Sequence, residues 1–401
     1  MLPAGTPDGL GQDDELLGTT LPYTVMVYFA DTPDALYQIE QWYSTFRALD
    51  KTHPVVIVLK DSRTARAVRA RAKLPVIVVA HYTTIDDLLS RSPVKLALYV
   101  NHNPENFSNL RFGQLIHVSL MHGDSDKTVT VSNQTKAYDF SFVAGQAAVD
   151  RMAAYATLYD ASSRCIPVGR PQVDEQLQRR SELQATIQRG ERQTVLYAPT
   201  WEGAQVTAAY GSVASHGVEI VRRILDTTDY RVVYRPHPLT GVRDAAYGDA
   251  DAQVRDAIAE AAEREPDVGH RVDVGVDVAE SFAIADLLVC DVSGVAMDWL
   301  PSGKPMLMTR PAEPSARVAR TPLTELVPAI TTGDVDAAVE SFREHIEHDP
   351  LRSARKELTD YYLGDLTPGA STRRFVEACT RLVALRDQEM ARIASHEGVV
   401  L

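Results

Sequence analysis

Short apolar runs alternate with amphipathic stretches along this chain, and the alternation predicts parallel β-sheets covered by helices. In the first half the apolar runs are 23–29, 55–59, 76–80, 96–100, 115–118 and 140–144. Between the first two runs, apolar residues follow helical spacing from Pro33 to Leu49. The second half repeats the pattern with strands at 194–197, 231–234, 287–290 and 305–308 and a helix at 218–225. The sequence therefore predicts an α/β protein.

The length of the chain indicates more than one domain, because 401 residues exceed one ordinary hydrophobic core. Residues 172–193 are polar, charge-rich and helix-forming, which is typical of a connection between domains. We expect a flexible lead-in at 1–20, an N-terminal domain at 21–171, a C-terminal domain at 172–370, and a helical segment at 371–401 that packs back toward the N-terminal domain.

Composition and charge exclude several classes of protein. The net charge of −13 argues against a general nucleic-acid binder. No apolar run approaches the roughly 20 residues of a membrane-spanning helix. The three cysteines, Cys165, Cys290 and Cys379, are too few and too far apart for a disulfide framework or a zinc site. We therefore expect a cytoplasmic protein.

One basic stretch interrupts the acidic background between Lys60 and Lys73. It holds four arginines, Arg63, Arg66, Arg69 and Arg71. The simpler interpretation is a solvated helix face. The alternative is a cationic patch that binds an anionic polymer or lipid headgroups, which would place the protein at the inner face of the plasma membrane.

The stretch 285–300 carries the clearest candidate for ligand binding. An apolar strand ends at Cys290, a turn follows, and a helical pattern starts at Val295 with Ser293 placed to cap it. Backbone N–H groups and the helix dipole at such a joint suit a phosphate. Asp298 lies in the first predicted helical turn, where its carboxylate can reach a ribose hydroxyl. An ordinary strand–turn–helix joint is the alternative.

Three more polar side chains follow strands of the same predicted sheet: Thr200, Arg235 and His237. The carboxyl ends of parallel strands share one edge, so we expect these side chains to converge with Ser293. A guanidinium offers phosphate oxygens a rigid fork of donors. Taken singly, Thr200 also fits a turn residue and Arg235 a surface ion pair.

In the first half, a polar loop follows the strand that ends near Val118. His122 lies in this loop with Gly123 and Lys127 close by. Active sites of open α/β sheets lie at such strand ends, and an imidazole there can take a proton from an attacking hydroxyl near neutral pH. A histidine that is hydrogen-bonded within the loop is the alternative.

Six segments occur in an order that carries a family resemblance. They are His122-Gly-Asp-Ser-Asp-Lys, Val168-Gly-Arg-Pro-Gln-Val-Asp, Tyr197-Ala-Pro-Thr-Trp, Tyr234-Arg-Pro-His-Pro, the stretch 285–298 and the segment 364–373. Together they resemble the CDP-glycerol glycerophosphotransferase family of teichoic-acid and related polymer synthesis. Four positions depart from the family pattern: Asp124 and Ser125 replace a Thr-Pro pair, Val292 replaces a tyrosine, and Gly294 replaces a serine.

The resemblance implies a GT-B fold, in which two Rossmann-like domains with parallel sheets face each other across a cleft. It implies transfer of glycerol phosphate from CDP-glycerol, or of a related polyol phosphate, to a polymer or lipid-linked acceptor, with release of CMP. His122 is then the general base, while His237 and Arg235 hold the pyrophosphate. Further donor contacts are implied for Thr200, Ser293, Gly294, Asp298, Ser371, Thr372 and Arg373, and acceptor contacts for Gly123, Asp124, Ser125 and Lys127.

Two other functions stay open at this point. A nucleotide-sugar glycosyltransferase or a UDP-N-acetylglucosamine 2-epimerase shares the fold, and a non-catalytic relative can keep it as well. No metal-ligand spacing is visible, so neither a protein-bound metal nor a tightly bound cofactor is predicted. A Mg²⁺ ion held on the pyrophosphate is left open.

Overall fold

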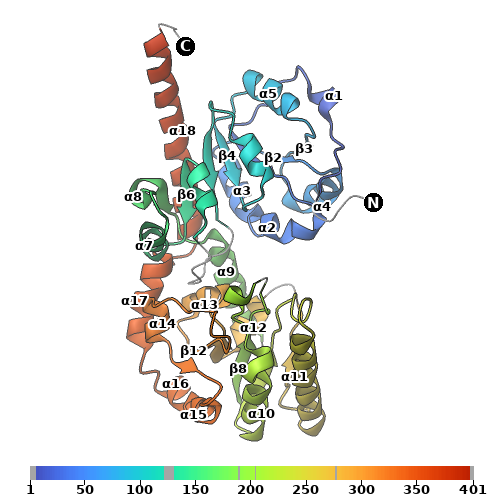
Figure 1. The fold of residues 1–401 in the computed structure, drawn as a ribbon, viewed down its shortest axis with the longest axis vertical. Coiled ribbons are helices and arrows are strands. Elements are labelled where there is room, and N and C mark those ends of the chain that lie inside the picture. The colour runs from blue at the N-terminus through green and yellow to red at the C-terminus, as the bar shows by residue number, and fades with distance from the viewer. Residues whose placement is uncertain (1–5, 122–130, 188–189, 204, 276–277, 398–401) are drawn as a thin grey trace. The chain divides into compact units, whose positions relative to one another are not determined.

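The computed structural model describes residues 6–121, 131–187, 190–203, 205–275 and 278–397. They form two compact units, each built on a parallel sheet (Figure 1). Among the described residues, unit 1 comprises residues 6–121, 131–175 and 363–397, and unit 2 lies within 176–362. One division falls inside helix α9 (Pro171–Thr186) and the other at the end of helix α17 (Arg352–Leu363).

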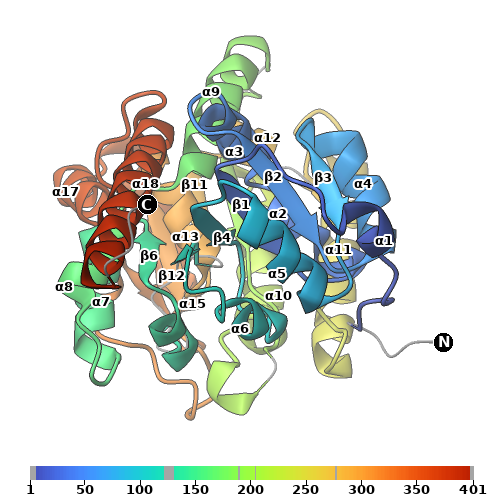
Figure 2. The ribbon, with the colours of Figure 1, turned by 90° about the horizontal axis from the view of Figure 1, so that it is seen from above.

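Unit 1 contains a seven-stranded sheet in the order β3-β2-β1-β4-β5-β6-β7, and all its pairs are parallel. The strands are β1 (Val25–Phe29), β2 (Val55–Leu59), β3 (Val76–Val78), β4 (Leu96–Tyr99), β5 (Ile116–Ser119), β6 (Phe140–Val143) and β7 (Cys165–Pro167). Figure 2 shows β3, β2, β1 and β4 side by side in this order. Every residue of β1 and β2 is buried, which explains their unbroken apolar runs.

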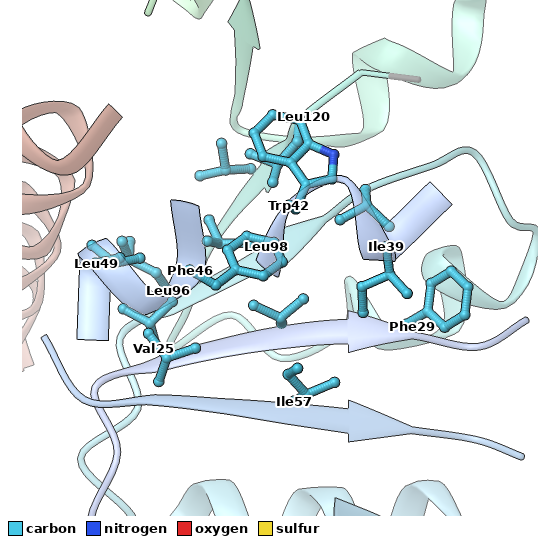
Figure 3. Close-up of a cluster of buried hydrophobic side chains, with 14 of the residues drawn as sticks. Val25, Phe29, Ile39, Trp42, Phe46, Leu49, Ile57, Leu96, Leu98 and Leu120 are labelled. Carbon is cyan, nitrogen blue, oxygen red and sulfur yellow. The ribbon is translucent and has the colours of Figure 1, made fainter. Parts of the chain in front are cut away.

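The helices of unit 1 cover both faces of this sheet. They are α1 (Asp13–Leu16), α2 (Leu36–Glu40), α3 (Tyr43–Asp50), α4 (Ser62–Ala72), α5 (Tyr82–Arg91), α6 (Glu105–Asn109), α7 (Gln146–Tyr155), α8 (Ala161–Arg164) and α18 (Ala370–Glu397). On one face, Trp42 and Phe46 lie over β1 and β4 (Figure 3). The Phe375 ring of α18 packs against both, with centroids 5.8 Å and 6.5 Å away. The C-terminal helix therefore contributes to the core of unit 1.

The helix predicted from Pro33 to Leu49 is interrupted. The structure has a 3₁₀ turn at Pro33–Ala35 and then the separate helices α2 and α3, with a break at residues 41–42. Trp42 stands at the N-cap of α3 and is 5% exposed. The periodicity thus indicated the buried face correctly and missed the break.

The acidic residues near the N-terminus make specific contacts, although the sequence predicts only a flexible lead-in. The Gln12 N–H donates to the Val78 carbonyl at 2.8 Å, and the Val78 N–H donates to Gln12 Oε1 at 3.2 Å. Asp13 accepts the N–H groups of Ala80 and His81, each at 2.9 Å. Carboxylates and amides here satisfy backbone groups that an edge strand would leave exposed.

Unit 2 contains a six-stranded sheet in the order β10-β9-β8-β11-β12-β13, again with parallel pairs. The strands are β8 (Gln193–Ala198), β9 (Tyr230–Tyr234), β10 (Arg271–Val272), β11 (Leu287–Cys290), β12 (Met306–Thr309) and β13 (Ala329–Ile330). The helices, besides parts of α9 and α17, are α10 (Val218–Asp226), α11 (Ala245–Arg264), α12 (Ala279–Ile284), α13 (Gly294–Trp299), α14 (Pro322–Leu326), α15 (Val335–Glu340) and α16 (Phe342–Glu347). Figure 1 shows α10 and α11 side by side, and one core cluster joins them to α15 and the sheet.

The basic stretch forms helix α4, and most of its charges are bound within the protein. Lys60 is only 8% exposed and donates to the Ala80 carbonyl. Arg63 pairs with Asp61, and Arg71 pairs with Glu40. These contacts favour the solvated-helix interpretation over a cationic patch. Within the part of the chain that the structure describes, every helix is too short or too polar to cross a bilayer.

Candidate functional site

The candidate site of unit 2 is built where strands β8 and β11 end. The two strands are neighbours in parallel register, with Ala198 opposite Cys290. The turns that follow, at 199–202 and 291–294, therefore leave the sheet side by side. Their contacts decide which polar groups are available to a ligand.

The Asp291 side chain connects these two turns through hydrogen bonds. Its side chain is fully buried, and Oδ2 accepts the N–H groups of Thr200 at 2.7 Å and Ser212 at 3.2 Å. The Thr309 hydroxyl, at the end of β12, donates to Oδ1. Burial raises the pKa of Asp291, and the hydrogen bonds from Ser212, Thr309 and Thr200 only partly oppose that rise. Asp291 fixes the Thr200 backbone in place.

Two hydroxyl groups at this edge are candidates for binding a ligand. Ser293 is 6% exposed, and its Oγ is buried without a partner among the described residues. Thr200 is also 6% exposed, and Asp291 binds its N–H but not its hydroxyl. A buried hydroxyl without a partner costs about 1–3 kcal/mol, which a ligand oxygen can recover.

The predicted cap at Ser293 is correct in position and wrong in contact. Ser293 is the N-cap residue of α13, but its side chain makes no capping hydrogen bond. The helix begins at Gly294 and has six residues, so Asp298 lies beyond its first turn. A helix this short adds little dipole, and the hydroxyls together with the Gly294 N–H are the better candidates for holding phosphate.

Arg235 is engaged in an ion pair, as its alternative interpretation predicts. Nη1 donates to Asp273 Oδ2 at 2.7 Å, and Nη2 donates to the Gly275 carbonyl at 2.8 Å. The Asp273 pKa is lowered: burial raises it, but hydrogen bonds from Ser281 and Gly275 and the charge of Arg235 outweigh burial. The pair ties the β9 turn to the β10 turn.

His237 has a defined tautomer. Its Nδ1 accepts the N–H of Leu239 at 3.1 Å, which requires the proton of the neutral ring to be on Nε2. The ring stacks on Trp201, with centroids 6.1 Å apart and planes 20° from parallel. In the neutral form, His237 therefore carries its ring proton on Nε2.

Glu202 binds the loop that follows His237. Its carboxylate accepts the N–H groups of Arg243 at 2.8 Å, Gly241 at 3.1 Å and Asp244 at 3.2 Å. The side chain belongs to a residue that is only 6% exposed. Burial alone would raise the Glu202 pKa, yet these backbone hydrogen bonds lower it overall. Glu202 is therefore ionised at neutral pH.

The C-terminal candidates lie in unit 1, where their polar groups are bound. The N–H and hydroxyl of Thr372 both donate to Asp174 Oδ2 at 2.8 Å. Ser371 is fully buried, and Arg374 donates to its hydroxyl. Arg373 donates to the Pro368 carbonyl. Donor binding by these three residues stays a prediction.

The acceptor-side candidates His122, Gly123, Asp124, Ser125 and Lys127 lie outside the described residues. Sequence reasoning missed three residues that build the described site, Asp291, Glu202 and Asp273. Each is an acidic residue that lies within four residues after the end of a strand, where parallel sheets place polar groups. This position in the sequence could have identified them as site residues.

A family model decides the affiliation. The model for CDP-glycerol:poly(glycerophosphate) glycerophosphotransferase matches residues 43–378. The chain belongs to this family. It is accordingly a transferase of glycerophosphate groups. No curated protein sequence matches the chain significantly.

Solved structures confirm the GT-B fold of this glycerophosphotransferase. The wall teichoic acid polymerase TagF matches with a TM-score of 0.52 and 14% identity, over 94% of this chain and 92% of that one. A glycosyltransferase from Rickettsia africae matches with a TM-score of 0.55 and 9% identity, over 90% and 99%. S. aureus MnaA with UDP matches with a TM-score of 0.53 and 13% identity, over 88% and 94%. At such identities these likenesses show the fold alone.

The geometry of the unit 2 edge suits an anion rather than a metal ion. Hydroxyl, guanidinium and imidazole donors gather there, while the nearby carboxylates are already bound to N–H groups. Among the described residues, no group of His, Cys, Asp and Glu is arranged to hold a metal ion.

Proposed function

We propose that this enzyme transfers glycerol phosphate, or a related polyol phosphate, from a CDP-linked donor to a hydroxyl of a cell-wall or capsular polymer. The observation that carries the proposal is the buried, unpartnered hydroxyl of Ser293, on a strand end of unit 2 that adjoins the strand end carrying Thr200. The hydroxyls of Ser293 and Thr200 and the Gly294 N–H can donate hydrogen bonds to phosphate oxygens. Such donors stabilise the negative charge on these oxygens during phosphoryl transfer.

The reaction forms one P–O bond and breaks another. The acceptor oxygen attacks the β-phosphorus of the donor, and the bond from that phosphorus to the bridging oxygen breaks, so that CMP leaves. His122 accepts the proton of the acceptor hydroxyl. The Nε2–H of His237 and the guanidinium of Arg235 stabilise the charge on CMP. Asp298 is the proposed contact of the ribose.

Two comparisons support the donor. The family model names CDP-glycerol and poly(glycerophosphate). A structure of a TagF variant was obtained with CDPG soaked in, and it matches this chain with a TM-score of 0.51. The acceptor and any contact with a membrane are part of the proposal.

The proposal is tested by following CMP release from CDP-glycerol and CDP-ribitol, each with polyol-phosphate and glycan acceptors. We expect Thr200→Val to lower turnover about 100-fold, which is the loss typical of one transition-state hydrogen bond. The exposed Thr186 of α9 provides the matched control, and Thr186→Val should keep wild-type turnover. Equal rates for the two variants would remove the Thr200 hydroxyl from the site.

Binding assays separate this function from its alternatives. CDP should raise the melting temperature more than UDP does, because a ligand stabilises the folded state according to its occupancy. A larger shift with UDP would indicate a nucleotide-sugar enzyme. Binding of CDP without CMP release for any acceptor would indicate a non-catalytic relative.

A further inference from the structure

Trp201 contacts His237, and Glu202 contacts the loop that follows it. The function proposed above gives neither residue a role. Thr200 is fixed through its N–H to the buried Asp291. The next residue, Trp201, stacks on the His237 ring. The residue after that, Glu202, binds the loop that follows His237. The three consecutive residues 200–202 thus connect the buried Asp291 carboxylate to the His237 ring and to the loop after it.

The loop held by Glu202 is the one that sets the His237 tautomer. The His237 carbonyl accepts the Thr240 N–H at 2.9 Å, which closes a tight turn. Inside this turn the Leu239 N–H donates to Nδ1. The Val242 N–H then donates to the Leu239 carbonyl at 3.2 Å, and the next contacts are those to Glu202. In each link the donor is a backbone N–H group of the segment 239–244.

The charge of Glu202 suits this task. An ionised carboxylate is an acceptor only and can take several N–H groups at once. An amide of the same shape has one acceptor oxygen and an NH₂ group, which would face at least one backbone N–H. A loop without secondary structure of its own would then lose part of its anchoring. The side chain of Leu239 is 43% exposed and that of Val242 66%, so packing alone does not hold the loop.

We propose that Glu202 is a positioning residue that keeps the proton of neutral His237 on Nε2 by anchoring the loop at 239–244. This rests on the proposed function only for its kinetic consequence. In the transferase, the anchored ring directs its Nε2–H at the departing CMP oxygen. Loss of the anchor lets the ring rotate or exchange tautomers, and the donor is then absent for part of the time.

The test uses full-length protein labelled with ¹⁵N-histidine, in which His237→Gln assigns the His237 signals. Wild-type His237 should show the Nε2–H tautomer, and Glu202→Gln should show a mixture of tautomers. The kinetic expectation is a kcat about tenfold lower with little change in KM, since one hydrogen-bond donor to developing charge contributes about 10²–10³-fold and is only partly lost. Glu260→Gln, on the exposed face of α11, removes the same charge and should match the wild type.

The outcomes separate this inference from the proposed function. Unchanged His237 signals in Glu202→Gln would overturn the positioning role, whatever the activity. A tautomer mixture without CMP release in any variant would leave the positioning role intact and reject the transferase proposal. If Glu202→Gln does not fold, hydrogen exchange of wild-type protein decides: the amides of Gly241, Arg243 and Asp244 should be protected, and fast exchange there would overturn the proposal.

Discussion

Unit 1 and unit 2 each use an aspartate to hold a threonine, but the two threonines keep different groups available. In unit 1, Asp174 takes both the N–H and the hydroxyl of Thr372. In unit 2, Asp291 accepts only the N–H of Thr200, and its other hydrogen bonds come from the Ser212 N–H and the Thr309 hydroxyl. Both threonines belong to segments that resemble family motifs. The difference between the two sites is whether the aspartate binds the threonine hydroxyl as well as the threonine N–H.

The settings of the two carboxylates also differ. Asp291 is fully buried at the carboxyl end of β11, a strand inside the parallel sheet of unit 2. Asp174 is partly buried on α9 and satisfies a free N–H in the first turn of α18. Removing the buried carboxylate leaves several donors without partners, whereas removing the other leaves a helix end near solvent. The comparison therefore predicts unequal losses of stability.

The largest effect is expected for Asp291→Ala, which should lower the free energy of unfolding of unit 2 by about 3–5 kcal/mol. The N–H groups of Thr200 and Ser212 and the Thr309 hydroxyl would lose their acceptor. Urea unfolding in a Trp42→Phe background measures this, because the remaining Trp201 and Trp299 both lie in unit 2. A loss below about 1 kcal/mol would mean that other groups satisfy these donors.

Asp291→Asn sharpens the same prediction through pH. The folded state raises the Asp291 pKa above 3.8, so it favours the neutral carboxyl. Stability from this group is then complete below the ordinary pKa and lost as pH rises through the raised value. The wild type should lose stability relative to the non-titrating asparagine variant as the pH rises from about 4 toward neutral. A constant difference between the two across this range would contradict the raised pKa.

Much of this fold could be predicted from periodicity, because the central strands are buried on both faces and give continuous apolar runs. The predicted strand 287–290 matches β11 (Leu287–Cys290). The strands that escaped prediction, β7, β10 and β13, have three, two and two residues and lie at sheet edges. Edge strands this short bury few side chains and give a weak pattern. The edge strand β3 also has three residues, but it was predicted because it lies within the longer apolar run 76–80.

The candidate site could be predicted only in outline. Strand order brings Thr200 and Ser293 to one edge, which the parallel-sheet rule anticipates. The rule does not tell whether a polar group is already bound within the protein. Arg235 and Thr372 were expected to face the donor, and both pair with aspartates that are remote in the sequence. Such pairings depend on tertiary structure and leave no local pattern.

A smaller loss is expected for Gly169→Ala, which strains the same contact region of unit 1. Gly169 has φ of +81°, and a Cβ there would lie 2.3 Å from Ser371 Oγ and 2.4 Å from Arg374 Nη2. We expect unit 1 to lose about 1–3 kcal/mol through backbone strain and displacement of these side chains. Hydrogen exchange of α18 measures the loss, and Gly333→Ala, where a Cβ meets no atom within 4 Å, is the control. Equal protection of α18 in the two variants would show that the contact yields without cost.

The smallest effect is expected for Thr372→Val, which keeps the N–H bound to Asp174 and removes only the hydroxyl. Loss of one hydrogen bond of this kind should lower stability by about 1 kcal/mol, seen as faster exchange at the start of α18. Because Asp174 already occupies the hydroxyl, CMP release should stay within about twofold of wild type, in contrast to Thr200→Val. A loss of turnover as large as that of Thr200→Val would mean that the Thr372 hydroxyl leaves Asp174 for the donor during the reaction. The two threonines would then play the same part, and the difference between the units would hold only without ligand.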